Sequence, residues 1–338
     1  MNYTFFDIIG ELTFAKTFNS LETGEEHTFI SNFFEVILGN SYNRFLTSYP
    51  YLSIPFSMIM GRKQVIKAMS KNNENTVLTQ ELTKKRIEMG EEAKTGQRDF
   101  MSHIYAVDIC SRLKKNREGE QAMPNEDIML NSVILVGAGS ETTASAMTFF
   151  FYATGMNTAQ KQILQDEIRS TFNDESEIDM VNCGQISYLQ ACIEEALRMF
   201  PPAAETPPRV SPGANIGGEF IPSGTIIHVY PWATFRNPEN FTDPDSFRPE
   251  RWLPPTHPRY STRYAKDNLA CFKPFSHGPR DCIGKNLAYN EMRLLISRLL
   301  FRFDYELLAG QEKWHSDQRA YLIWIKNPLN VRLTLRKN

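Results

Sequence analysis

Apolar residues recur every three or four positions up to about residue 200, which predicts a largely helical segment. The segment 60–94 is charged and amphipathic, as in a helix that lies in solvent, whereas 128–152 is apolar on nearly every face and indicates a helix in the protein interior. This spacing predicts helices at residues 5–18, 26–38, 60–94, 128–152, 158–172 and 186–200.

The pattern changes after Pro201 and Pro202, which end the last of these helices. Turn residues and alternating apolar positions then predict strands and loops, followed by one more helix. The expected elements are a turn at Gly217 and Gly218, a strand at 225–230, an irregular stretch at 235–274, a helix at 283–301, and a hairpin of 321–325 with 331–335. The chain is therefore expected to be mainly α with a minor β-sheet region.

Composition narrows the class of protein without naming a function. The 338 residues permit one large domain or two small ones, and 41% hydrophobic with 22% charged residues exclude collagen-like, low-complexity and disordered chains. Lys and Arg number 37 against 39 Asp and Glu, a formal net charge of −2. This balance gives no reason to expect nucleic acid as a partner.

The cysteines and the hydropathy of the chain indicate in which cellular compartment the protein is expected. The five cysteines form no Cys-x-x-Cys pair, so neither a disulfide framework nor a structural zinc site is indicated, and a reducing compartment is expected. Cys110 and Cys192 fall on predicted helices and are expected in the core. The sequence begins without the basic and apolar regions of a signal peptide, and it has no run of about 18 to 20 apolar residues that would span a membrane.

Cys282 lies in a glycine-flanked loop directly before the predicted helix 283–301. A helix N-terminus and the neighbouring Arg280 and Lys285 both favour the thiolate form, and the glycines let backbone N–H groups approach the sulfur. These features are typical of a cysteine that acts as an activated nucleophile or as a metal ligand. Taken by itself, the loop still favours a buried, inert cysteine.

Residues 275–284 read Phe-Ser-His-Gly-Pro-Arg-Asp-Cys-Ile-Gly. They resemble the Phe-x-x-Gly-x-Arg-x-Cys-x-Gly haem-binding loop of the cytochrome P-450 family and match it at every defined position. Three further motifs resemble the family in its own order: 138–142 the oxygen-activating segment of the central helix, 195–198 the Glu-x-x-Arg motif, and 247–252 the Phe-x-Pro-Glu-Arg-Phe motif with Trp252 as its last residue. Residues 233–238 look most like fungal microsomal members.

The resemblance implies a haem cofactor whose iron is held by the Cys282 thiolate. Arg280 and Arg209 are implied as partners of the haem propionates, since a guanidinium pairs with a carboxylate through two hydrogen bonds. The other residues implied to contact the haem are Phe275, Gly278, Gly284, Ala138 and Gly139.

The resemblance assigns proton handling to Thr142 and Glu141 in the helix at 128–152. Thr142 can turn its hydroxyl to the carbonyl of Ala138, leaving a polar notch for dioxygen and a water, and Glu141 would be a buried carboxylate that relays protons. A satisfied core hydroxyl is the alternative for Thr142. Gly137 and Gly139 each cost roughly 1 kcal/mol in a helix interior, which indicates that something flat approaches the backbone closely there.

Glu195 and Arg198 share one helix face, and with Arg251 they are expected to form a buried charge network. Loss of one partner from such a network costs roughly 3 to 5 kcal/mol. The resemblance assigns these residues to locking the loop that presents Cys282, and not to catalysis.

The implied protein is a single partial cytochrome P-450 catalytic domain over residues 1–338, without the membrane anchor and first helices of the family. The implied function is a haem-dependent monooxygenase that inserts one oxygen atom from O2 into a small apolar substrate in fungal secondary metabolism. Electrons would come from NADPH through a flavoprotein reductase that docks near Lys273, His277 and Lys285, at the cytosolic face of the endoplasmic reticulum membrane. Val136 is among the implied substrate contacts.

Two alternatives stay open at this point. One is a catalytically inactive remnant that binds haem weakly or not at all. The other is a hydrolase with a cysteine nucleophile, which needs a partnered histidine and an Asn or Asp. The sequence contains six histidines but no such signature.

Overall fold

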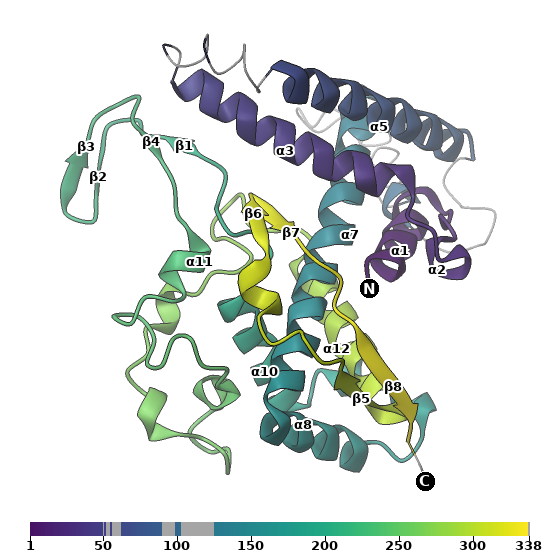
Figure 1. The fold of residues 1–338 in the computed structure, drawn as a ribbon, viewed down its shortest axis with the longest axis vertical. Coiled ribbons are helices and arrows are strands. Elements are labelled where there is room, and N and C mark those ends of the chain that lie inside the picture. Colours follow the sequence, from purple (N-terminus) through teal and green to yellow (C-terminus); the bar gives the residue numbers. More distant parts are fainter. Residues whose placement is uncertain (50, 52–54, 56–61, 90–98, 103–124, 337–338) are drawn as a thin grey trace, which may run out of the picture. The chain divides into compact units, whose positions relative to one another are not determined.

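The computed structural model describes residues 1–49, 51, 55, 62–89, 99–102 and 125–336. It contains two compact units, Met1–Ala144 and Ser145–Asn338 (Figure 1). The single domain over 1–338 stays a prediction. Cys110, expected in the core, lies outside the described residues.

The described part of the first unit is helical. It contains α1 (Asn2–Phe14), α2 (Ser20–Thr23), α3 (Thr28–Ser48), α5 (Arg62–Glu88) and the N-terminal part of α7 (Asn125–Met156). Helices α3 and α5 pack against each other (Figure 1). An aromatic cluster forms the core, with Phe6 stacked on Phe18 at 4.1 Å between ring centroids. Val136 belongs to this core, so the structure gives it a packing role in place of the expected substrate contact.

Helix α5 corrects the expectation of a helix that lies in solvent. The side chain of Arg86 is 0% exposed, and its guanidinium binds Asp99 with an Nε to Oδ2 distance of 2.5 Å. Asn75 is also buried and donates a hydrogen bond to the carbonyl of Phe29 at 3.1 Å. Buried polar groups need such partners. The periodicity of apolar residues missed this face because paired polar side chains cover it.

Helix α7 matches the interior helix expected at 128–152 and continues from the first unit into the second. From Glu126 to Met156 it is, among the described residues, the one helix long and apolar enough to cross a membrane by length and composition. Within its most apolar window, 61% of the residues are buried inside the protein. A core helix of a soluble protein passes the same test.

The second unit contains the helices expected at 158–172, 186–200 and 283–301, with ends that differ by at most two residues. Prolines 201 and 202 directly follow the C-cap of α10, as expected. The α-helices are α8 (Thr158–Thr171), α9 (Met180–Cys183), α10 (Ser187–Met199), α11 (Pro231–Thr234) and α12 (Lys285–Arg302). The short 3-10 helices are η2 (Glu175–Glu177), η3 (Pro249–Trp252), η4 (Thr262–Tyr264), η5 (Leu269–Cys271) and η6 (Trp314–Asp317).

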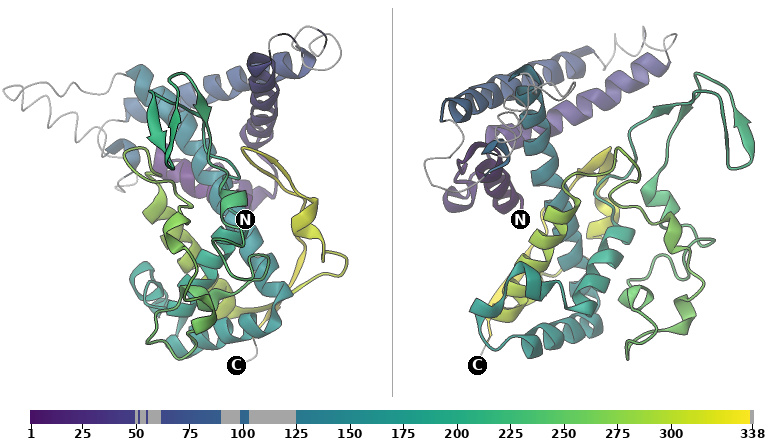
Figure 2. Two further views of the ribbon diagram at one scale, coloured as in Figure 1. Left: turned by 90° about the vertical axis from the view of Figure 1, so that its left-hand side faces the viewer. Right: turned by 180° about the vertical axis from the view of Figure 1, so that it is seen from behind.

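Two small antiparallel pairs follow α10. Strand β1 (Arg209–Val210) pairs with β4 (Ile226–Ile227), and β2 (Ala214–Ile216) pairs with β3 (Glu219–Ile221). The turn expected at Gly217 and Gly218 joins β2 to β3, and both residues have positive φ, 61° and 91°. This hairpin projects from the second unit (Figure 2).

The expected C-terminal hairpin is wrong. Strand β7 (Ile323–Ile325) pairs with β6 (Arg319–Tyr321), and β8 (Val331–Leu335) pairs with β5 (Phe303–Leu307). Alternating apolar residues identify strands but do not choose their partners. Strand β5 follows α12 without a break, so its pattern was hidden behind the end of the helix.

One carboxyl group of α12, that of Glu291, is buried. The side chain of Glu291 is 7% exposed, and within the described ranges the structure shows neither a hydrogen bond nor an ion pair to it. Burial raises the pKa of Glu291 to about 7, because the charged form loses its hydration.

Replacing Glu291 by Gln should remove a pH-dependent loss of stability. The unfolded chain releases this proton near pH 4.5 and the folded protein near pH 7, so wild-type unfolding free energy falls as pH rises between these values. We expect E291Q to be more stable than wild type at pH 8 by about 1 to 3 kcal/mol, with the difference vanishing toward pH 4.5. Urea unfolding across pH 4.5 to 8 measures this, with the exposed Glu306→Gln as control. Parallel curves for E291Q and wild type would contradict it.

Candidate functional site

The loop 275–284 closes on itself through backbone hydrogen bonds. The N–H of Cys282 donates to the carbonyl of Phe275 at 2.9 Å, and that of Asp281 donates to Gly278 at 3.0 Å. Gly278 has φ 88° and Ser276 has φ 66°. A left-handed conformation of this kind favours glycine, which explains Gly278. The loop thus presents Cys282 at a defined place just before α12.

Cys282 is exposed, which contradicts the inert buried cysteine favoured by the loop alone. Among the described cysteines, Cys183 and Cys192 are buried, as expected for Cys192, and Cys271 is partly exposed. A Cβ atom at Gly284 would lie 3.8 Å from the sulfur of Cys282, which is an ordinary van der Waals contact. Close approach of the backbone to the sulfur therefore does not require a glycine at 284. At 278 the backbone conformation requires the glycine, and a Cβ there would meet no atom within 4 Å.

The basic residues expected around the loop all lie on the surface of the second unit. Arg280, Lys273, His277 and Lys285 are exposed. Arg209, at the start of β1, is exposed as well, and its Nη1 donates to the carbonyls of Pro207 and Pro208 at 3.3 and 3.2 Å. The binding of propionates by Arg209 and Arg280 stays a prediction.

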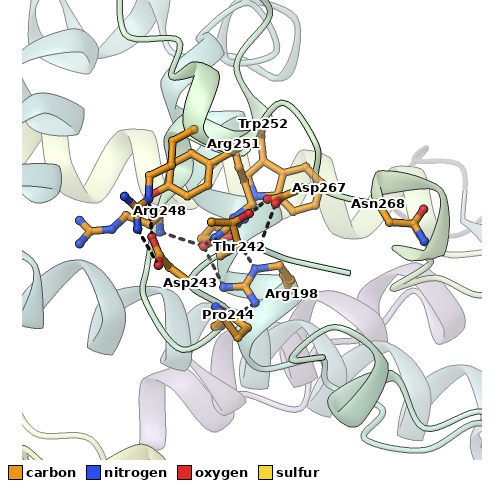
Figure 3. A network of polar contacts seen from close by, with 12 residues as sticks. Arg198, Thr242, Asp243, Pro244, Arg248, Arg251, Trp252, Asp267 and Asn268 are labelled. Atoms are coloured by element: carbon orange, nitrogen blue, oxygen red, sulfur yellow. Dashed lines mark hydrogen bonds and ion pairs between the residues drawn. The ribbon is translucent and has the colours of Figure 1, made fainter. Parts of the chain in front are cut away.

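The structure brings Glu195, Arg198 and Arg251 together. Both side chains that α10 contributes, Glu195 and Arg198, are 0% exposed. Arg198 donates from Nε and Nη2 to the two carboxylate oxygens of Glu195 at 2.8 and 2.9 Å, and Nε of Arg251 lies 3.1 Å from the same carboxylate. Figure 3 shows Arg198 and Arg251 within one network of polar contacts. Arg198 also donates to the carbonyls of Phe235 and Pro244, which ties α10 to the irregular stretch before the loop.

Two opposing effects act on the carboxyl group of Glu195. Burial raises its pKa, but the guanidinium groups of Arg198 and Arg251 outweigh burial, and the pKa lies below its usual value. The carboxylate is therefore charged at neutral pH. A charged, fully buried carboxylate fixes the positions of all the donors that compensate it.

Sequence reasoning missed two members of this network. The indole Nε1 of Trp252 donates to Glu195 at 2.9 Å, and Asp267 forms an ion pair with Arg251 (Figure 3). The signal for Trp252 was present, because this residue replaces the phenylalanine of the family motif and phenylalanine has no donor. Asp267 lies in a stretch with no motif, so the sequence held no signal for it.

Thr142, Glu141 and Ala138 lie on the part of α7 that belongs to the first unit. The hydroxyl of Thr142 donates to the carbonyl of Ala138 at 2.6 Å, as expected. Ala138 is exposed and Thr142 is partly exposed, so this notch is open. Glu141 is 2% exposed and accepts a hydrogen bond from Nδ2 of Asn2 at 2.8 Å, which agrees with the expected buried carboxylate.

The two glycines of this helix have a different explanation from the expected one. A Cβ at Gly137 would lie 2.5 Å from the ring of Phe33, and a Cβ at Gly139 would lie 2.6 Å from Ile9. Side chains of α3 and α1 therefore approach the backbone of α7 here. Helix packing accounts for both glycines, and contact of Gly139 with a haem stays a prediction.

Trp252→Phe should destabilise the second unit more than a matched substitution elsewhere. The indole of Trp252 donates to a charged acceptor, so its loss costs about 1.5 to 3 kcal/mol. Trp314 is more deeply buried, but its indole donates to the neutral carbonyl of Asn327, so W314F loses about 0.5 to 1.5 kcal/mol of hydrogen bonding. Urea unfolding at neutral pH compares the two variants. A loss in W314F equal to or above that in W252F would show that the bond to Glu195 contributes little.

Comparison with known proteins gives one consistent result. The profile of the cytochrome P-450 family matches residues 1–333. Cytochrome P-450 monooxygenase aclL of Aspergillus oryzae is 36% identical over 98% of this chain and 63% of its own length. Trichothecene C-15 hydroxylase of Fusarium sporotrichioides is 34% identical over 99% of this chain and 64% of its own length. The chain thus spans less than two thirds of these relatives.

A solved structure shows the same fold. The haem domain of cytochrome P-450DA superposes with a TM-score of 0.78 at 19% identity, over 99% of this chain and 67% of that domain. Members of the family hold haem iron through a cysteine thiolate. With the family profile matching nearly the whole sequence, the chain belongs to the cytochrome P-450 family.

Proposed function

We propose that this protein is a haem-dependent monooxygenase that inserts one atom of O2 into a C–H bond of a small apolar organic substrate. The other oxygen atom leaves as water, with an electron pair and two protons consumed. The observation that supports this most strongly is the loop 275–284, which holds an exposed Cys282 directly before α12.

The residues of the loop are suited to supply a ligand to haem iron. Among the described residues, no cluster of three or more His, Cys, Asp or Glu side chains could hold a bare metal ion. Cys282 would instead supply the one thiolate that the chain must provide to a haem iron, because the porphyrin brings its own nitrogen donors. Bound in this way, haem supplies activation of dioxygen, because the thiolate favours O–O cleavage.

The other residues of the candidate site position the cysteine loop or handle protons. Glu195, Arg198 and Arg251 hold the segment that leads to the loop, and the backbone bond between Phe275 and Cys282 orients the cysteine. In α7, Thr142 presents a hydroxyl at an open notch and Glu141 provides a nearby buried carboxylate. We assign the handling of protons in the reaction to this pair.

Substrate and partner are inferred from the relatives and the surface charge. Trichothecene C-15 hydroxylase and the Aspergillus enzymes are fungal, and we place this protein in fungal secondary metabolism. The exposed Lys273, His277 and Lys285 near the loop favour an acidic electron donor, an NADPH-dependent flavoprotein reductase. From the resemblance to fungal microsomal members, we also propose that the protein works at the cytosolic face of the endoplasmic reticulum membrane.

Replacing Cys282 by Ser tests the proposal directly. The purified protein, reduced and treated with carbon monoxide, should show the Soret band of a thiolate-bound haem, and C282S should lose that band. Cys271→Ser is the matched control, because Cys271 is also partly accessible but lies outside the loop. Absence of bound haem in the unmodified protein would favour an inactive remnant, and a thiolate band in C282S would refute the assignment.

Thr142→Ala should separate catalysis from cofactor binding. Removal of a group that assists proton transfer lowers the rate by about 10²-fold or more. We expect T142A to keep the thiolate band and to lose product formed per NADPH consumed, and Thr142→Ser to restore part of it. Unchanged product yield in T142A would show that the Thr142 hydroxyl has no role in proton transfer and only bonds the carbonyl of Ala138.

A further inference from the structure

A second set of contacts joins α10 to α12 beside the Cys282 loop. Glu194 lies on a different face of α10 from its neighbour Glu195. Both oxygens of the Glu194 carboxylate lie 3.0 Å from the hydroxyl of Tyr289. Nε2 of Gln190, one helical turn earlier, donates to the same carboxylate at 2.6 Å. The network around Glu195 does not include these residues.

Tyr289 connects this set to the cysteine loop. Its ring packs against the ring of Phe275, with centroids 4.9 Å apart and planes inclined by 50°. Phe275 is the residue whose carbonyl accepts the N–H of Cys282 at 2.9 Å. Only one aromatic contact therefore lies between the Tyr289 side chain and the backbone bond that orients the cysteine.

The orientation of Tyr289 is fixed from several sides. The guanidinium of Arg293 lies over its ring at 5.2 Å, and Nε of Arg293 donates to Oε1 of Gln190 at 2.7 Å. Gln190, Glu194, Tyr289 and Arg293 thus form a closed ring of contacts between the two helices. Burial raises the pKa of Glu194 and of Tyr289, so the tyrosine stays protonated and remains the donor.

A cavity of about 530 Å³ lies next to these residues. Phe275 and Tyr289 both line it, together with Trp252, Phe272 and Lys285. On that side Phe275 has open space in place of packed side chains. The contact with Tyr289 consequently carries more of the positioning of Phe275 than it would in a close-packed core.

We propose that Tyr289 and Glu194 are positioning residues that hold Phe275 and, through it, the backbone hydrogen bond that orients Cys282. The meaning of this for catalysis rests on the proposed haem-thiolate function, but the structural effect does not. Tyr289 acts through Phe275 and does not itself touch the sulfur.

Hydrogen exchange tests the structural effect without reference to haem. In Tyr289→Phe the ring stays but the bond to Glu194 is lost, and we expect amides in a peptide covering 275–284 to exchange about five- to tenfold faster. Glu194→Gln keeps an acceptor for the hydroxyl and should give a smaller increase. The control is Tyr305→Phe, which also removes a buried hydroxyl, the one bonded to Thr154 in the same unit.

The spectrum of the carbon monoxide complex tests the effect on the ligand. We expect Y289F to convert part of the thiolate band to the band of a haem without thiolate, and Y305F to leave the ratio unchanged. Equal exchange rates in 275–284 for wild type and Y289F, or equal effects of Y289F and Y305F on the band ratio, would overturn the proposal. If wild type shows no thiolate band, the proposed function fails, and the exchange comparison still decides the role of Tyr289.

Discussion

The carboxylate of Glu195 is the group on which the second unit depends. It is charged, it has no exposed surface, and its donors come from α10 itself, from the backbone of Arg248, and from Arg251 and Trp252 in η3. A buried charge is tolerated only while its donors stay in place, so the carboxylate dictates where the irregular stretch after α11 must lie. That stretch leads directly into the loop of Cys282. The position of the Cys282 loop thus depends on a residue to which we assign no catalytic role.

Helices were predictable from the sequence because their signal is local. The helices at 158–172 and 186–200 were expected within two residues of their observed ends, since apolar spacing and the prolines after Phe200 are read over one or two turns. Pairing between strands is not local. The partner of β8 is β5, separated from it by two other strands, and no pattern inside either segment states that choice.

The candidate site divides in the same way. Motif residues such as Glu195, Arg198 and Arg251 were predictable as a group, and the structure brings them together. Asp267 and Tyr289 were not predictable, because each matters only through a neighbour that is distant in sequence. Gly139 shows a further limit: the sequence indicates that something approaches this backbone, but not that it is the side chain of Ile9.

The left-handed conformation of Ser276 bears on how small a mimic of this site can be. A residue other than glycine in that conformation is disfavoured by about 1 to 2 kcal/mol, so the loop does not prefer its own shape. The N–H of Ser276 is held by the carbonyl of Lys273, which precedes the loop, and the ring of Phe275 packs against Tyr289 of α12, so two of its restraints come from outside the loop. A synthetic decapeptide with the sequence of the loop would therefore sample many conformations, and its thiol would behave as that of an ordinary flexible peptide.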